Sequence, residues 1–169
     1  MGCNLELAGV DDSFKKITMA LLESDDLFKL LKYTEPNALD LTISKSDKYK
    51  LINQDDKSTR RVIFQPYKKD MVVDDKRTEL RIYMLGMNPQ NRFVGTIYFG
   101  FDIVCHDDLW QLNGGKQRAL VIAQEIYKLL NANKVDIIGK LEAGNNRMQL
   151  REFQDDFSGY SFALSAGTS

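Results

Sequence analysis

Four side chains that could hold a metal ion lie close together near the middle of the chain, where a long alternating run ends. They are Asp102, His106, Asp107 and Asp108. If the run is a β-strand, Asp102 and His106 share a face, because side chains alternate from face to face along a strand. Carboxylate and imidazole groups can hold a divalent cation, which activates water or polarises a phosphate. One hypothesis is therefore a metal-dependent nuclease or phosphoesterase that uses Asp102, His106 and Asp107.

The same residues also fit a structural role. Aspartates such as Asp107 and Asp108 favour turns, and His106 would be the polar end of a strand that emerges into solvent. The chain has one histidine. An active site needs several groups that converge, and the sequence does not repeat this pattern elsewhere. We therefore favour the structural interpretation and expect a protein that is not an enzyme, with no catalytic, cofactor-binding or metal-binding residues.

Two further patterns have weaker links with chemistry. Residues 113–117, Asn-Gly-Gly-Lys-Gln, lack the spaced glycines and the hydroxyl residue after lysine that a phosphate-binding P-loop requires. They are interpreted as a flexible corner before a helix. Cys105 and His106 are adjacent, and adjacent residues on a strand point to opposite faces. They are therefore not expected to form a nucleophile and base pair.

The strand that carries these residues is the centre of the predicted fold. Residues 93–106 alternate, with apolar side chains at most odd positions, a pattern typical of a half-buried strand. A helix is predicted from near Lys116 to residue 131, with one apolar stripe along it. The stripe consists of Ala119, Ile122, Ala123, Ile126 and Leu130. The sequence thus predicts one long strand covered by one amphipathic helix.

The other strand signals predict a mainly antiparallel sheet. Residues 80–87 alternate and are followed by the turn residues 88–91, so they should form a hairpin with residues 93–106. Shorter runs at residues 60–65, 148–153 and 160–164 are the other strand candidates. The predicted fold class is α+β, with about four to six strands.

The N-terminal third of the chain is predicted to differ from the rest. Residues 1–36 should form an arm, up to residue 11, and a helical hairpin capped by Asp12 or Ser13 and by residues 24–26. Residues 37–59 are polar and are predicted to be irregular. Residues 60–169 are assigned to the α+β core, within a single domain overall.

Composition favours a globular protein that is made and used inside a cell. The 169 residues are 43% apolar with a formal net charge of −1, so the basic excess usual in DNA-binding proteins is missing. The two cysteines lie far apart, which suits a reducing compartment. No apolar run reaches the length of a membrane span, and no signal peptide is visible.

Two surfaces are candidates for protein contacts. Trp110 lies in the acidic corner between the central strand and the helix, a position suited to anchoring a partner. Residues 67–78 place lysine, arginine and aspartate around a small apolar tip, and they are predicted to form a projecting loop.

The order of these elements resembles the small neck and tail-completion proteins of tailed bacteriophages, above all the tail terminators. The resemblance covers roughly residues 60–165 and lies in element order, without an invariant motif. The elements on which the resemblance rests are a strand, the projecting loop, the hairpin that ends at His106, the helix with Arg118 and residues 125–131, residues 138–141, and the final strand with residues 157–162.

The resemblance implies a virion structural protein, assembled in the host cytoplasm. Such proteins form a ring, usually of six subunits, that ends the tail tube and joins it to the head connector. The genome DNA would pass through the lumen without specific binding, and no membrane is involved. Copies in a ring meet through two different patches. The patches expected here consist of Lys68, Lys69, Asp74, Asp75, Lys76, Arg77, Asp107, Asp108 and Trp110.

Overall fold

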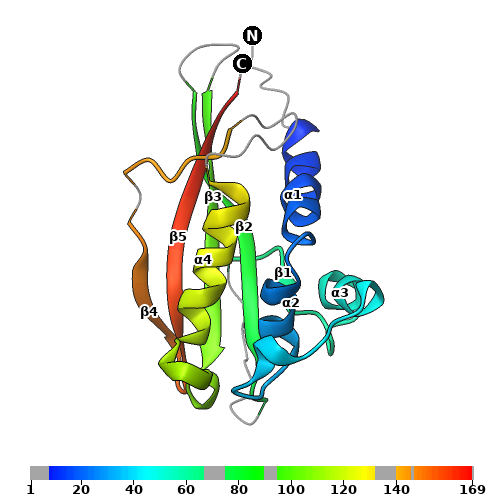
Figure 1. Cartoon of the computed structure of the whole chain (residues 1–169). Coiled ribbons are helices and arrows are strands. Elements are labelled where there is room, and N and C mark those ends of the chain that lie inside the picture. Colours follow the sequence, from blue (N-terminus) through cyan, green and yellow to red (C-terminus); the bar gives the residue numbers. More distant parts are fainter. Residues whose placement is uncertain (1–7, 67–74, 90–94, 132–139, 146, 169) are drawn as a thin grey trace.

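The computed structural model describes residues 8–66, 75–89, 95–131, 140–145 and 147–168. Over these residues the fold is α+β, with four α-helices and a five-stranded mixed sheet (Figure 1). The strand order across the sheet is β1-β2-β3-β5-β4. The strands are β1 (Val62–Ile63), β2 (Thr78–Pro89), β3 (Gly95–His106), β4 (Gln149–Gln154) and β5 (Phe157–Thr168). The helices are α1 (Ala8–Leu21), α2 (Asp25–Lys32), α3 (Lys45–Ile52) and α4 (Arg118–Leu130).

The predicted hairpin forms the middle of this sheet. Strands β2 and β3 pair antiparallel from Thr78 and Cys105 at one end to Pro89 and Gly95 at the other. Strand β5 covers the free edge of β3 along its whole length, from Gly95 and Thr168 to His106 and Phe157. The central strand is therefore hydrogen-bonded on both sides.

The sheet is not antiparallel throughout, because β1 runs parallel to β2, with Val62 opposite Leu80. Strand β1 is also shorter than the predicted residues 60–65. The Arg61 amide donates to the Leu51 carbonyl at 2.7 Å, outside the sheet. On the outer side of β1, the side-chain amide of Gln54 donates from Nε2 to the Val62 carbonyl at 2.8 Å. A side chain thus occupies a position where a further strand would bind.

Helices α1, α2 and α4 together cover one face of the sheet, so the prediction of a single covering helix was wrong. Figure 1 shows α4 over β3 and β5. Helix α2 lies beside β2, and α1 lies above α2 in this view. The core joins residues from all three helices, such as Ile17, Phe28 and Ile122, to Phe99 and Phe101 of β3. A sheet face of five strands is too wide for one helix to bury.

Helices α1 and α4 begin at other residues than predicted. Helix α4 begins at Arg118, because Gly114 and Gly115 take positive φ angles of 77° and 75° and Lys116 is extended. Helix α1 begins at Ala8, so Asp12 and Ser13 lie within it and residues 8–11 are not part of an arm. The predicted cap of α2 is confirmed, since the Ser24 hydroxyl accepts from the Leu27 amide at 3.1 Å.

Residues 37–59 were predicted to be irregular, but they contain a 3₁₀ turn, Ala38–Asp40, and helix α3. The Ser44 hydroxyl caps α3 by accepting from the Asp47 amide at 3.1 Å. Lys48 attaches α3 to the preceding helices, since its ammonium group donates to the Leu22 carbonyl and pairs with Asp25 at 2.5 Å. The polar face of α3 carries this attachment, which explains why an apolar pattern did not reveal the helix.

A candidate interaction surface at the end of the central strand

The proposed metal ligands do not converge. Asp102 and His106 both belong to β3, and two residues four positions apart on a strand are separated by about 13 Å, too far to bind one ion directly. Asp102 and His106 are buried, whereas Asp107 is exposed in the turn that follows. In the described part of the chain, no group of three or more His, Cys, Asp and Glu residues could hold a metal ion. The geometry therefore gives the nuclease hypothesis no support.

Asp102 instead belongs to a hydrogen-bonded layer on the sheet face that is turned away from the helices. Its carboxylate accepts from the Ser161 hydroxyl at 2.5 Å and from the Tyr83 hydroxyl at 3.2 Å. Burial, followed by the charge of Asp102, raises the pKa of Tyr83 to about 12. In the same layer, the buried Glu79 pairs with Arg77 at 2.9 Å and with Arg81 at 3.5 Å.

His106 closes the end of the central strand. Its Nδ1 accepts from the Asp108 amide at 3.1 Å, and its ring meets Phe157 edge to face at 5.0 Å. The neighbouring Cys105 belongs to the core beneath the helices. Burial raises the pKa of the Cys105 thiol to about 11. Such a thiol is a poor nucleophile at neutral pH.

Asp107, Asp108 and Trp110 do come together, as walls of a groove of about 560 Å³. Its other walls are Gln111, Leu150 and Ser158, and we call this hollow the acidic groove. Trp110 is half-buried against Tyr160, at 6.0 Å between ring centroids. Leu150 on β4 is 65% exposed. The acidic groove thus combines two carboxylates with a half-buried tryptophan, a residue type enriched in protein contacts, and an exposed leucine.

Lys76 links the two surfaces that the sequence suggested separately. Its ammonium group lies 2.6 Å from the Asp108 carboxylate, and more than half of each side chain is exposed. The hydrogen bond from Lys76 holds the pKa of Asp108 below its usual value. Exposed pairs of this kind contribute little to folding stability. The pair therefore joins the segment before β2 to the turn after β3 without adding much to stability.

The other predicted contact residues have different positions. Arg77 is buried, with 8% of its side chain exposed, and pairs with Asp75 at 2.8 Å and with Glu79. Arg77 is thus held against the sheet by the carboxylates of Asp75 and Glu79 and is not exposed in the described chain. Asp75 remains exposed. Lys68, Lys69 and Asp74 lie outside the described residues, as do residues 67–74 of the predicted projecting loop.

Arg118 holds the corner that carries Trp110, a role that the sequence analysis missed. Its side chain is fully buried. Nε donates to the Leu109 carbonyl at 2.9 Å, and the guanidinium also donates to four carbonyls in the last turn of α2 and the segment that follows it. These carbonyls belong to Leu30, Tyr33, Thr34 and Glu35. Position 118 lies on the apolar stripe of α4, with Ile122 and Ile126, and a charge on such a stripe was the available signal.

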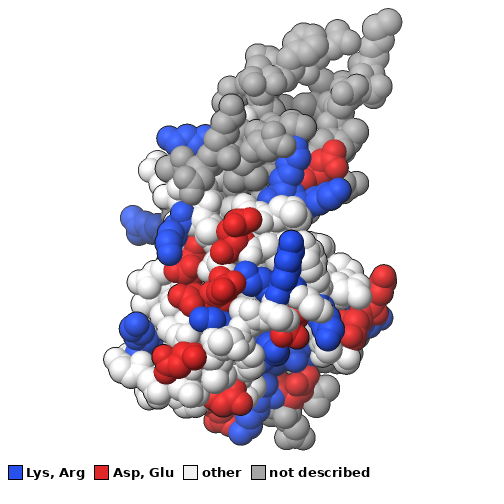
Figure 2. Space-filling view, turned by 45° about the vertical axis from the view of Figure 1, so that its right-hand side comes forward, with Lys and Arg blue, Asp and Glu red and all other residues white. Residues whose placement is uncertain are grey.

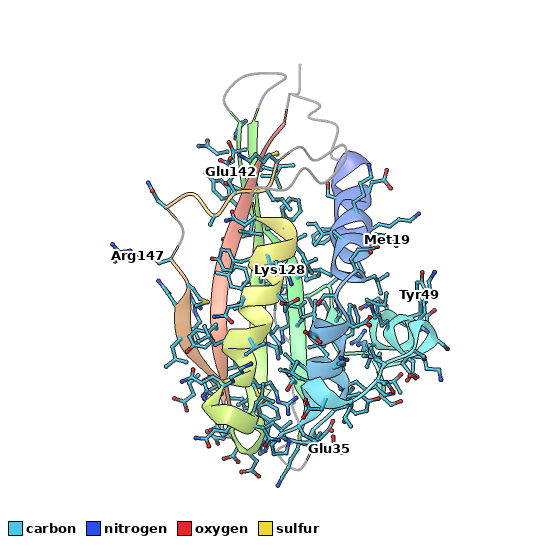
Figure 3. The ribbon with its side chains drawn as sticks, viewed as in Figure 1. Met19, Glu35, Tyr49, Lys128, Glu142 and Arg147 are labelled. Atoms are coloured by element: carbon cyan, nitrogen blue, oxygen red, sulfur yellow. The ribbon has the colours of Figure 1, made fainter. Side chains whose placement is uncertain are left out.

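A second groove lies at the opposite margin of the sheet. Phe14, Lys15, Thr18, Met19, Ile52 and Phe64 enclose about 510 Å³, and we call this hollow the apolar groove. Phe14 is one of the lining residues and contacts Phe64 and Phe99, at 5.9 and 5.7 Å between ring centroids. Met19 is 51% exposed and projects from α1, as Figure 3 shows.

The charged groups on the face shown in Figure 2 are mixed. Lys and Arg alternate with Asp and Glu over the described part of that face, and they form no basic stripe there. Nucleic-acid binding proteins usually present such a stripe. Among the described helices, none has the length and apolar character needed to cross a membrane.

Comparison with known proteins places the chain in a family. Residues 24–165 match the YomW family, a range that includes α2, α3, α4, the acidic groove, part of the apolar groove and the five strands up to Ser165. No curated protein gives a significant match. The gene name of the family is of the phage-derived, Bacillus SPbeta type, which indicates a phage-associated protein. Since the match covers most of its length, the chain belongs to the YomW family.

Proposed function

We propose that the chain is a virion structural protein of the phage neck, a tail terminator that forms a ring at the end of the tail tube. The observation that carries this proposal is membership of the phage-associated YomW family by a chain whose element order resembles the tail terminators. The ring, with six copies, would join the tail tube to the head connector. The chain would thus be assembled in the host cytoplasm and remain in the virion.

The two margins of the sheet support this proposal. A chain closes into a ring when one patch binds a different patch on the next copy. The β4 margin has the acidic groove with Leu150, and the β1 margin has the apolar groove with Met19. Large exposed apolar side chains beside a hollow are typical of protein contacts. Two unlike surfaces of this kind suit head-to-tail association.

The polar residues of the central strand support a structural role in place of a catalytic one. Asp102 is held by Ser161 and Tyr83, and His106 accepts a main-chain hydrogen bond. These groups hold strands and turns together. A chain with a net charge of −1 also has no basic excess to retain DNA in a lumen.

Deletion of the gene from a phage that encodes this chain tests the proposal. We expect lysates that contain DNA-filled heads and separate tails, some of abnormal length, and very few infectious particles. Expression of the chain from a plasmid should restore joining. Normal infectious particles after deletion would contradict the proposal, as would the absence of the chain from purified virions in mass spectrometry.

A further inference from the structure

The two grooves carry charges of opposite sign. The charged side chains that line the acidic groove are Asp107 and Asp108, and the one that lines the apolar groove is Lys15. Lys15 and Asp107 are both exposed. Neither forms an ion pair with another residue in the described ranges. Asp107 and Lys15 are thus available to each other between two copies of the chain.

The two grooves lie at opposite margins of the sheet and at different levels along its strands. The acidic groove is formed by the turn that follows β3 and by β4 and β5, at one margin of the sheet. Helix α1, with Lys15 and Met19, lies at the other margin, on the far side of α4 from β4 (Figure 1). A translation across the sheet combined with a shift along the strands therefore brings α1 of one copy to the acidic groove of the next.

Each margin also carries an exposed apolar side chain, Met19 on α1 and Leu150 on β4. Met19 follows Lys15 by four residues on α1, so both point outward from the same face of the helix. The acidic groove offers Trp110 and the exposed Leu150 to an apolar side chain. Methionine sulfur packs well against aromatic rings. A convex helix face with one apolar and one basic group can thus enter a hollow with apolar and acidic groups.

We propose that α1 of one copy binds in the acidic groove of the next copy, with Met19 against Trp110 and Leu150 and with Lys15 paired to Asp107. This inference rests on the proposed ring and names its contact. Because the two patches differ, the contact is heterologous and continues from copy to copy until a ring closes. Opposite charges on the two surfaces fix the register of the contact and determine which patch binds which.

Charge exchange tests the contact. Lys15→Glu and Asp107→Lys each place like charges at every contact, so each variant alone should assemble at least about tenfold more weakly than the wild type. An equimolar mixture of the two variants should assemble again. In the mixture, the glutamate introduced at position 15 of one variant meets the lysine introduced at position 107 of the other, and the remaining contacts keep the natural pair. Analytical ultracentrifugation measures all four samples.

Two matched variants control for nonspecific effects of charge. Lys57→Glu and Asp40→Lys make the same charge changes at exposed positions outside both grooves. They should assemble like the wild type. Thermal unfolding of each variant shows whether the fold is kept.

Disulfide trapping gives a second readout. Met19→Cys and Leu150→Cys are made separately in a Cys3→Ser background, and the two chains are mixed. Mild oxidation should link one copy to another through the introduced thiols, while Cys105 stays buried and unreactive.

The outcomes separate the contact from the ring. Assembly of the wild type together with equal assembly of Lys15→Glu, or no disulfide between positions 19 and 150 in assembled samples, would overturn the contact and leave the ring proposal standing. A wild-type chain that stays monomeric at every concentration and on isolated tail tubes would overturn both. Assembly of the mixed variants beyond a dimer would establish a head-to-tail contact, because a symmetric contact between identical patches closes at the dimer.

Discussion

Arg118 shows how a single buried charge can organise the candidate surface. Its guanidinium reaches five main-chain carbonyls, from Leu109, from the last turn of α2 and from the segment that follows it. Carbonyls at the end of a helix carry partial negative charge, which compensates for the loss of hydration. Burial nevertheless lowers the pKa of Arg118. The residue is therefore stabilised only where all of these carbonyls are in place.

Replacement of Arg118 by Met should lower the free energy of unfolding by about 3 kcal/mol or more, because several buried carbonyls lose their donor. Arg118→Lys should recover only part of this loss, since an ammonium group cannot reach so many acceptors. Urea unfolding measures both variants. Lys116→Met, at an exposed position just outside the helix, is the control. Equal stability of Arg118→Met and the wild type would show that the network contributes little.

Gly159 allows β5 to lie close to β3. A Cβ atom at this position would fall 1.7 Å from the Ile103 carbonyl oxygen. Gly159→Ala should therefore destabilise the protein by about 1–3 kcal/mol or more. Gly167 lies on the same strand with open space around it, so Gly167→Ala should change stability far less. Similar melting temperatures for the two variants would contradict this explanation.

Cys105 should make the free energy of unfolding depend on pH in the alkaline range. Burial raises the pKa of its thiol from 9.0 to about 11. The unfolded chain therefore loses this proton first, and the contribution of Cys105 is complete below pH 9 and disappears as the pH rises to 11. Between these values, the wild type should lose about 2 kcal/mol that Cys105→Ala does not lose. Parallel pH profiles for the two proteins, from urea unfolding, would rule this out.

At the scale of elements, the sequence was informative where side chains follow a local period. Alternation predicted the hairpin of β2 and β3, and the apolar stripe predicted α4. Helix α3 could not be predicted in this way, because its two buried side chains are Lys48 and Leu51, which form no apolar stripe. The parallel pairing of β1 depends on residues far along the chain, which local patterns do not specify.

The candidate site was predictable to a similar degree. Asp107, Asp108 and Trp110 follow a recognisable strand, so their place in a corner could be expected. The contribution of Leu150 came from a distant strand and had no local signal. The burial of Arg77 was not expected, because arginine is usually exposed, whereas here the carboxylates of Asp75 and Glu79 hold it against the sheet.

The attachment of α3 through Lys48 makes a prediction for that helix. Lys48→Met removes the hydrogen bond to Leu22 and the ion pair with Asp25, so α3 should open more often without unfolding of the sheet. Hydrogen exchange should become faster in residues 45–52, by about tenfold or more, while β2 and β3 keep their protection. Lys45→Met, at the exposed start of α3, is the control. Uniformly faster exchange throughout the chain would instead indicate global destabilisation.

At the scale of the whole molecule, the protein is a sheet covered on one face by three helices, with an unlike surface at each margin. The acidic groove and the outer face of α1 differ in charge and lie far apart, which favours chains of contacts over closed pairs. Membership of the phage-associated YomW family gives this architecture its setting. The proposed ring in the phage neck accounts for both the unlike margins of the sheet and the phage-associated family.

Electron cryo-microscopy of virions from a phage that encodes this chain tests the ring most directly. We expect a ring of copies between the head connector and the last layer of the tail tube, with α1 of each copy next to Trp110 of its neighbour. Density for the chain elsewhere in the particle, or intact necks that lack it, would contradict the proposed ring.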